Sequence, residues 1–188
     1  MKKYLFVWWM ICCFVFTPSC GSDDNDEIVD DTWKLANEKA FNDKTYDPAY
    51  TRYKALSNNG VIFYKQIHPG NGKQIYYNSR VKVFYQGALI DGTVFDKKDA
   101  RYDLPFLAAV SPAAANYSSS TNLNGYASVI EGWSVALQYM TEGEKGEVWI
   151  PQELGYSSTE QKDTRGNVTI PAYSTLIFEI EVAEIGEQ

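Results

Sequence analysis

Histidine is almost absent from this chain of 188 residues. His68 is the only one, and it lies in a predicted turn beside Pro69 and Gly70. A single histidine excludes a multi-histidine metal site, and in a solvated turn it is a poor base for a histidine-dependent triad. The sequence also lacks the G-x-S-x-G, H-E-x-x-H, P-loop and Rossmann glycine patterns. The usual signatures of hydrolases, zinc peptidases and nucleotide-binding enzymes are therefore missing.

Positive charge and cysteine are also scarce. Lys and Arg number 17 against 24 Asp and Glu, which gives a formal net charge of −7. Without a basic stripe to meet phosphates, a nucleic-acid partner is not expected. The three cysteines are Cys12, Cys13 and Cys20. The first two lie in an apolar run that we expect to be removed, so a disulfide within the mature chain is excluded.

Residues 1–19 have the pattern of a signal peptide. Lys2 and Lys3 precede the apolar run "YLFVWWMICCFVF", which is shorter than the roughly 20 residues of a transmembrane helix. Cys20 directly follows Ser19, and this junction resembles a bacterial lipoprotein processing site, where the cysteine becomes the lipidated first residue. Thr17 departs from the leucine-like residue usual at that place. The alternatives are ordinary secretory cleavage nearby and a fortuitous thiol at Cys20.

An acidic segment follows, and we interpret residues 20–31 as a solvated tether. "GSDDNDEIVDD" carries six acidic residues in eleven and no basic one, so it repels itself and stays extended. It also resembles the surface-export signal of Bacteroidetes-type lipoproteins, and a plain spacer is the alternative. We expect an exported protein, lipid-anchored in the bacterial envelope at the outer membrane, on its periplasmic or surface face. The lipid would be its only contact with the membrane.

Residues 32–58 are predicted to form a short helical extension. "DTWKLANEKAF" is rich in helix formers, and "DPAYTRYKALSNNG" offers Asp47 as a cap, Pro48 in a first turn and Asn59-Gly60 as a stop. Such an extension can pack on the main domain or mediate self-association, and the sequence does not decide between them.

Strand patterns dominate residues 59–188, which we predict to be one domain. Strands are expected in "GVIFYKQI", "VKVFYQG", "EKGEVWIP" and "STLIFEIEVAEI", which alternate apolar and polar side chains. Trp133, Ala136, Leu137 and Met140 recur at i, i+3, i+4 and i+7 and predict a short amphipathic helix. Several strands with one helix bury their apolar faces if the sheet curls over the helix. The predicted class is α+β, a twisted antiparallel sheet around one short helix.

Aromatic and aliphatic residues recur in ordered segments of this domain: "VFYQGALIDGTVFDKK", "LPF", "VIEGW", "IPQELGY" and "TIPAYSTLIFEIEV". Over about 125 residues these segments resemble the FK506-binding-protein (FKBP) type of peptidyl-prolyl cis-trans isomerase. Each residue alone has an ordinary interpretation as a core aromatic or a turn acid, whereas the ordered set points to the family. The resemblance implies the same fold that the strand and helix patterns indicate.

The resemblance also implies a proline-binding pocket. Trp133 would be its floor, with Val129 and Ile130 at the rim. The walls would be aromatic: Tyr85, Phe95, Phe106 and Phe178.

Polar groups of the pocket follow from the same resemblance. The Ile130 amide and the Tyr156 hydroxyl would hold the substrate backbone, with Ile170 near Tyr156. Asp96 would lie at the edge, bonded to the Tyr85 hydroxyl or to a basic neighbour such as Arg101.

The implied activity is isomerisation of X–Pro bonds in exported polypeptides, without metal or cofactor. Macrolides of the FK506 and rapamycin type are the other implied ligands. A weakly catalytic chaperone or peptide-binding module on the same fold is the alternative. A glycan-binding surface lipoprotein is a third hypothesis, suggested by the many Tyr and Trp residues.

Two segments depart from the family pattern. Residues 107–128 are longer than in a typical single-domain member and are expected to be an exposed loop beside the pocket. The loop after Tyr156 lacks the histidine seen in some members, and Thr169 stands where an aliphatic residue is common. Substrate preference and macrolide affinity therefore cannot be carried over.

Overall fold

The computed structural model describes residues 31–111, 114 and 125–186. The predicted signal peptide, Cys20, the acidic segment through residue 30 and most of the predicted loop at 107–128 lie outside the described residues. Within them, eight strands form one sheet in the order β1-β2-β7-β10-β3-β5-β6, with β4 paired to β3. These strands are β1 (Thr51–Lys54), β2 (Val61–His68), β3 (Arg80–Ala88), β4 (Val94–Lys98), β5 (Phe106–Ala109), β6 (Ala127–Ser128), β7 (Lys145–Ile150) and β10 (Leu176–Ile185).

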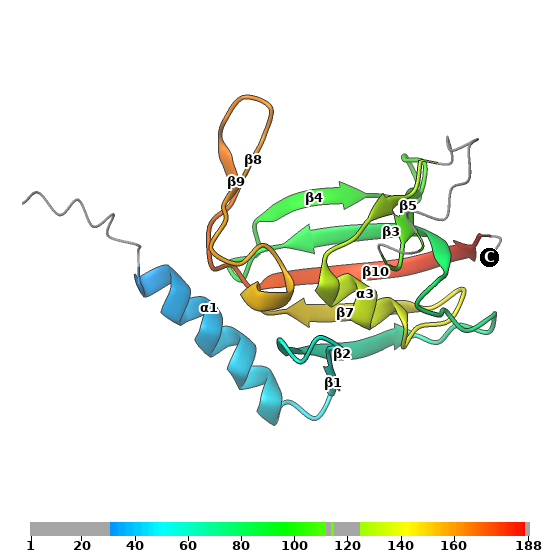
Figure 1. Ribbon diagram of the computed structural model, residues 1–188, viewed down its shortest axis with the longest axis horizontal. Coiled ribbons are helices and arrows are strands. Elements are labelled where there is room, and N and C mark those ends of the chain that lie inside the picture. The colour runs from blue at the N-terminus through cyan, green and yellow to red at the C-terminus, as the bar shows by residue number, and fades with distance from the viewer. Residues whose placement is uncertain (1–30, 112–113, 115–124, 187–188) are drawn as a thin grey trace, which may run out of the picture.

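Helix α3 (Glu131–Leu137) lies across one face of this sheet (Figure 1). Trp133, Ala136, Leu137 and Met140 are all at most 4% exposed, so the predicted apolar face of the helix is confirmed. These side chains form one core with the inward-facing residues of β2, β3, β7 and β10. The predicted α+β class, a sheet packed on one short helix, is confirmed.

Strand β10 is the centre of the sheet and follows its predicted alternation. It pairs antiparallel with β3 on one side and β7 on the other. Leu176, Phe178, Ile180 and Val182 face the core and are at most 5% exposed. A turn at Asp91-Gly92, a dipeptide typical of hairpin turns, joins β3 to β4, and Gly92 has a φ of +85°.

The second predicted helix of the N-terminal extension is wrong. α1 (Asp31–Asp43) and a 3-10 turn, η1 (Lys44–Tyr46), are followed by β1, which pairs with β2. Asp47 does not begin a second helix; it follows η1 as its C-cap, and its carboxylate accepts a hydrogen bond from the Ala49 amide within a turn. Tyr53 stacks on Tyr139 at 3.6 Å, so tertiary contacts override the local helix signals. The sheet therefore begins at residue 51, ahead of the predicted boundary at 59.

Two further expectations need correction near residues 107–128. The sheet is mixed rather than antiparallel throughout, because β5 and β6 are parallel. Residues 108–110 and 114 are also not part of an exposed loop: Ala108, Ala109 and Val110 have no exposed surface, and Ala114 is 2% exposed. They continue the core beneath the sheet edge, with the Val110 amide donating to the Ser79 carbonyl. Of residues 125–128, three are exposed as expected.

Helix α1 packs on the face of the sheet opposite α3. Phe63 of β2 alternates with the inward-facing Ile62 and Tyr64, and its ring contacts that of Phe41 at 4.9 Å. Lys44, which follows α1, lies 4.2 Å from the Trp149 ring, next to the inward-facing Val148 and Ile150 of β7. Side chains of a strand alternate between faces, so the two helices cover opposite sides of one sheet.

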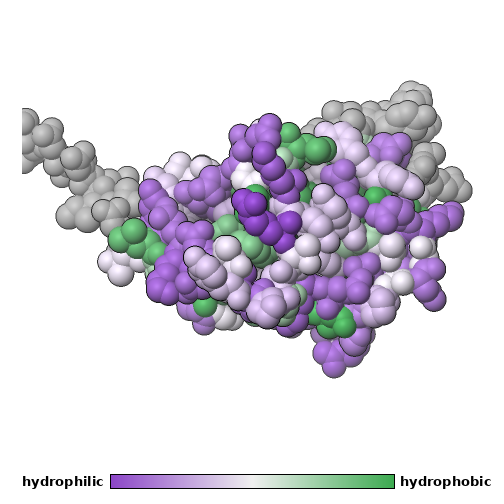
Figure 2. Space-filling view, turned by 90° about the horizontal axis from the view of Figure 1, so that it is seen from below, coloured by the Kyte–Doolittle hydropathy of each residue, from purple (hydrophilic) through white to green (hydrophobic). Residues whose placement is uncertain are grey.

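The remaining described strands form a separate hairpin, β8 (Gln161–Lys162) with β9 (Val168–Ile170). Figure 1 shows this hairpin projecting from the sheet, and we call residues 161–170 the flap. A short 3-10 turn, η2 (Gln152–Leu154), precedes it. On the face in Figure 2, hydrophilic side chains predominate and the hydrophobic ones form small separate patches. Among the described residues, no helix has the length and apolar character needed to cross a membrane.

Gly132 is required by the approach of α3 to β7, which generates the first prediction. A Cβ atom at Gly132 would lie 2.3 Å from Cγ2 of Ile150, whose side chain is fully buried and has no room to retreat. Gly132→Ala should therefore lower the free energy of unfolding by about 1–3 kcal/mol, despite the better helix propensity of alanine. Urea denaturation measures this difference.

Ser134→Ala is the matched control in the same helix, because Ser134 is only half-buried. It should change stability by less than about 0.5 kcal/mol. A Gly132→Ala protein as stable as the parent would contradict the proposed close contact between α3 and β7.

Candidate active site

A cavity of about 610 Å³ opens at the N-terminal end of α3, between β3, β4, β10 and the flap. It collects ten of the eleven residues predicted for the pocket. They are Tyr85, Phe95, Asp96, Phe106, Val129, Ile130, Trp133, Tyr156, Ile170 and Phe178. Segments spread over nearly a hundred positions of the sequence thus meet at one place.

Trp133 lies at the base of the cavity, boxed in by perpendicular rings. Tyr85 and Phe178 contact the indole edge-on, each with centroids 5.1 Å away, and Phe106 does so at 6.2 Å. Edge-to-face pairs of this kind are each worth about 0.5–1.5 kcal/mol beyond the area they bury. The arrangement fixes the indole plane and surrounds it with apolar walls.

Two donors at this base have no partner among the described residues. The indole N–H of Trp133 is buried and unpaired. The Ile130 carbonyl accepts hydrogen bonds from the Trp133 and Ser134 amides at 3.0 and 3.2 Å, as the first turn of α3 requires. No hydrogen bond from the Ile130 amide to another described residue is found. A buried unpaired donor costs about 1–3 kcal/mol, so the indole N–H of Trp133 is a local cost of this packing.

Tyr85 and Asp96 form the polar edge of the cavity. They lie on the adjacent strands β3 and β4, and the Tyr85 hydroxyl donates to Oδ2 of Asp96 at 2.5 Å. Burial raises the pKa of Tyr85 well above its usual value, and the hydrogen bond and negative charge of Asp96 raise it further. The phenol therefore stays a neutral donor, and its ring is held in place by Asp96.

Gly87 of β3 lies behind two rings of the cavity wall, and its role was not predicted from the sequence. A Cβ atom there would lie 2.6 Å from the rings of both Phe95 and Phe178. Its absence lets those two rings meet edge-to-face at 5.5 Å. A glycine inside the otherwise regular "VKVFYQG" strand was the available signal, since such a glycine often marks close approach.

Tyr156 and Ile170 come from the two sides of the flap base. Tyr156 precedes the flap, and burial followed by the charge of Asp96 raises the pKa of its hydroxyl. No hydrogen bond of this hydroxyl to another described residue is found. Ile170 ends β9 and is 5% exposed. The Tyr156 hydroxyl is thus a neutral donor at the cavity.

Polar residues of the flap and of β6 also line the cavity: Ser128, Gln161, Asp163 and the departure already noted, Thr169. Asp163 accepts hydrogen bonds from the Arg165 and Asn167 amides at 2.8 and 2.9 Å and from the Asn167 side chain. The Asn167 bonds, foremost among these, lower the pKa of Asp163. Asp163 therefore shapes the turn of the flap. The run "DTRGN" is typical of a turn, but nothing in it indicates a hairpin beside the pocket.

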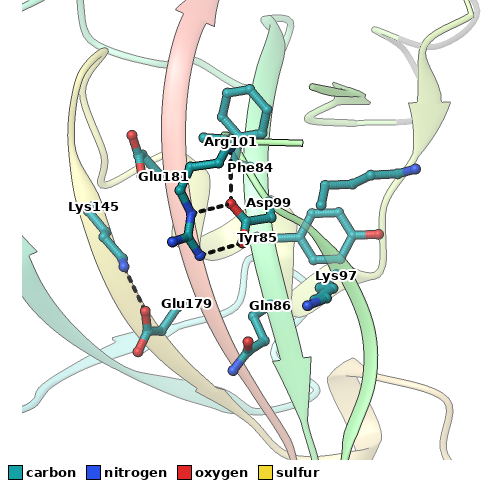
Figure 3. A pocket seen from close by; sticks show the side chains of 11 residues that line it. Phe84, Tyr85, Gln86, Lys97, Asp99, Arg101, Lys145, Glu179 and Glu181 are labelled. Carbon is teal, nitrogen blue, oxygen red and sulfur yellow. Dashed lines mark hydrogen bonds and ion pairs between the residues drawn. The ribbon is translucent and has the colours of Figure 1, made fainter. Parts of the chain in front are cut away.

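Arg101 is the predicted pocket residue that lies elsewhere. Of the two partners considered for Asp96, the structure has Tyr85; Arg101 instead pairs with Asp99 at 3.0 Å. Figure 3 shows Arg101 turned toward Asp99 in a separate groove that also holds the ion pair of Lys145 with Glu179. The physical reason is local: Asp99 also accepts the Arg101 amide in the same turn. The predicted place of Arg101 at the substrate pocket is therefore wrong.

The arrangement suits binding and orientation rather than acid–base chemistry. An apolar, ring-walled cavity accepts an apolar ring, and the Ile130 amide and Tyr156 hydroxyl offer donors to carbonyl groups beside it. Among the described residues, no group of three or more His, Cys, Asp or Glu side chains is placed to hold a metal ion.

Comparison with known proteins identifies the kind of domain. The sequence model of the family described as FKBP-type peptidyl-prolyl cis-trans isomerase matches residues 71–183. The FKBP-type 22 kDa peptidyl-prolyl cis-trans isomerase of Escherichia coli is 39% identical over 122 residues, which cover 65% of this chain. This chain spans 48% of the length of that relative.

Two other similar proteins are matched over nearly their whole length. The FK506-binding protein of Neisseria meningitidis is 32% identical over 129 residues, 68% of this chain and 99% of the relative. The crystal structure of a peptidyl-prolyl cis-trans isomerase from Pseudomonas syringae superposes with a TM-score of 0.62. At 24% identity it covers 84% of this chain and 96% of that one, which supports the fold.

The hydrogen bond between Tyr85 and Asp96 generates the second prediction. Asp96→Asn should lower the pKa of Tyr85 while leaving it above about 10, because burial is the larger cause. In the parent, a phenol whose pKa is raised by folding stabilises the protein fully below about pH 10. That contribution is lost as the pH rises from there through the folded-state pKa. Asp96→Asn should make this loss smaller.

Phenolate absorbance, taken as the difference from Tyr85→Phe, follows the titration. Asp91→Asn, in the turn between β3 and β4, is the control and should leave the titration of Tyr85 unchanged. An Asp96→Asn protein with the parental Tyr85 titration would contradict the hydrogen bond.

Proposed function

The chain belongs to the family of FKBP-type peptidyl-prolyl cis-trans isomerases, and we propose that it catalyses rotation about X–Pro bonds in exported polypeptides. The observation that carries the proposal is the ring-walled cavity with Trp133 at its base. A pyrrolidine ring resting on the indole would place the X–Pro bond beside the donors of Ile130 and Tyr156.

The energetics require no nucleophile. Rotation about a peptide bond faces a barrier of about 18–20 kcal/mol because of amide resonance. In the twisted state that resonance is lost, and the amide is less polar than in the planar state. A cavity that excludes water therefore favours the twisted state over the ground state. A thousandfold acceleration needs only about 4 kcal/mol of such differential stabilisation.

Hydrogen bonds add orientation. The Ile130 amide would hold a substrate carbonyl next to the rim, and the Tyr156 hydroxyl would bind the backbone from the flap side. Asp96 would act through Tyr85, whose ring it fixes against Trp133. The aromatic box is preorganised, so little of the binding energy is spent on ordering side chains.

Proline-containing polypeptides are the proposed substrates. Macrolides of the FK506 type are proposed as ligands of the same cavity, supported by the similarity to the FK506-binding protein of Neisseria meningitidis. The polar lining from the flap, Gln161 and Thr169, would set how tightly each of these binds.

An isomerisation assay on proline-containing tetrapeptides tests the proposal and is the third prediction. The parent protein should accelerate cis-to-trans exchange, and Trp133→Ala should lower kcat/KM by about tenfold or more, a loss of at least about 1.4 kcal/mol. Tyr85→Phe keeps the ring but frees it from Asp96, so it should cause a smaller loss. Because Trp133 is also part of the core, Tyr156→Phe provides a variant that removes only one hydroxyl.

Arg101→Ala is the control, since Arg101 lies outside the cavity, and it should keep kcat/KM within about twofold. Absence of acceleration by the parent with every residue tested before proline would overturn the enzymatic proposal. Refolding assistance that persists in Trp133→Ala would instead indicate the peptide-binding alternative.

For location, we propose export and attachment to the outer membrane of a bacterial envelope through a lipid on Cys20. The support is in the sequence: the charged and apolar segments of residues 1–19, the position of Cys20 after them, and the acidic segment that follows. That acidic segment would hold the domain away from the membrane surface.

The fourth prediction concerns Cys20. In a bacterial host, the parent chain should incorporate a labelled fatty acid and sediment with membranes, because one diacylated cysteine anchors a protein stably. Cys20→Ser should lose the label and appear in the soluble fraction. Unchanged labelling, or an unlabelled parent cleaved elsewhere near residue 20, would contradict the lipid anchor and favour ordinary secretion.

A further inference from the structure

Helix α1 lies outside residues 71–183, the part matched by the family model, yet it contacts the segment that joins the flap to β10. This segment, residues 171–175, connects Ile170 of the cavity to the start of β10. We call it the flap connector. Figure 1 shows α1 on the side of the sheet where the flap emerges.

Asn37 makes the central contact. Its side chain is 1% exposed, and its Oδ1 accepts the Thr175 amide at 2.7 Å. Its backbone carbonyl accepts the Thr175 hydroxyl at 3.2 Å, and its Nδ2 donates to the Trp33 carbonyl at 2.8 Å. Because the buried hydrogen-bonding groups of Asn37 have partners, this side chain fixes the position of Thr175. Thr175 is therefore tied to the helix by two hydrogen bonds.

Two more contacts extend along the connector toward Ile170. Trp33 donates its indole N–H to the Ser174 hydroxyl at 3.2 Å, and this hydroxyl in turn donates to the Pro171 carbonyl at 2.7 Å. The Lys34 ammonium lies 5.0 Å from the centroid of the Tyr173 ring. One face of α1 thus contacts residues 173, 174 and 175, and residue 171 is bound through Ser174.

The connector in turn holds the other side of the flap base. The Tyr173 amide donates to the Ser157 carbonyl at 2.8 Å. Both residues have positive φ, +61° for Tyr173 and +56° for Ser157. Side chains other than glycine rarely adopt this conformation, and it persists where the surroundings enforce it. Ser157 directly follows Tyr156. The chain of contacts therefore runs from α1 through the flap connector to the neighbour of Tyr156.

At its base the flap is also held by Ile170, which packs in the hydrophobic core. Its two short strands pair with each other and not with the main sheet, so its orientation depends on its base. From these contacts we infer that α1 positions Tyr156 and Ile170 for substrate binding, with Asn37, Trp33 and Lys34 as the positioning residues. The inference rests on the proposed function, because it assigns a role to α1 in that same site.

Asn37→Ala in the full chain is the principal variant. It should raise KM for a proline-containing peptide by about threefold or more and leave kcat within about twofold, since Tyr156 and Ile170 bind substrate without reacting. The peptide dissociation constant, measured by calorimetry, should rise in parallel. Hydrogen exchange of the Tyr173 amide should become faster, whereas that of Ile180 in β10 should stay as slow as in the parent.

Matched variants separate positioning from stability. Lys39→Ala, whose side chain is exposed on the same helix and pairs with Asp43, should leave KM and the exchange of Tyr173 unchanged. Trp33→Phe keeps an aromatic ring and removes only the bond to Ser174. It carries the same test with a smaller expected effect, and it replaces Asn37→Ala if that variant does not fold.

The outcomes are distinct. The inference would be overturned if Asn37→Ala lowers the stability toward urea but keeps the parental KM, peptide affinity and hydrogen exchange of Tyr173. Helix α1 would then be a structural element only. If the parent shows no isomerase activity, the proposed function fails; weaker peptide binding with faster Tyr173 exchange in Asn37→Ala would still support positioning by α1.

Discussion

The edge-on packing of the Trp133 indole against rings from β3, β5 and β10 is the interaction on which the rest of this structure depends. Helix α3 has only seven residues, too few to be stable without tertiary contacts. Its first turn is held by those rings and by the close approach of Gly132 to Ile150. The same rings line the cavity, so the contacts that fix the helix also build the site.

Because the same rings hold the helix and line the cavity, the cavity does not collapse. A protein core normally fills its space to crystal-like density, and an apolar void costs stability in proportion to its volume. Here perpendicular rings brace one another: Tyr85 against Trp133 and Phe106, Phe95 against Phe178. Their collapse into the void would break several edge-to-face pairs. The hydrogen bond of Tyr85 to Asp96 adds a polar constraint at the open side.

The sequence predicted the strands and the helix that have a regular apolar period, and the cavity residues that lie in ordered motifs. The alternation of Leu176, Phe178 and Ile180 and the 3.6-residue spacing from Trp133 each reflect burial on one face, which any sequence of this type must show. The ordered aromatic segments then located the residues of the cavity. These signals are strong because each residue serves the core and the cavity together.

What could not be predicted depends on partners far away in the chain. Residues 51–54 carry helix-like signals but pair with β2 and place Tyr53 on Tyr139. Arg101 resembled a pocket residue by position, and its partner was decided by the turn geometry at Asp99. The parallel pairing of β6 and the contact of Asp163 with the cavity likewise have no local pattern to reveal them. In each case tertiary contact overrides a local preference.

Strand β10 explains how a helix on one face of the sheet reaches a cavity on the other. At residue 178 the strand places a ring in the cavity wall, while three positions earlier the Thr175 amide is bound by Asn37 of α1. Adjacent residues of a strand face opposite sides, so a few residues at its start contact both layers. The central strand, held between β3 and β7, cannot shift on one side alone. A constraint applied by α1 at this end therefore acts on the flap connector, which α1 contacts directly, and not on the braced rings around Trp133.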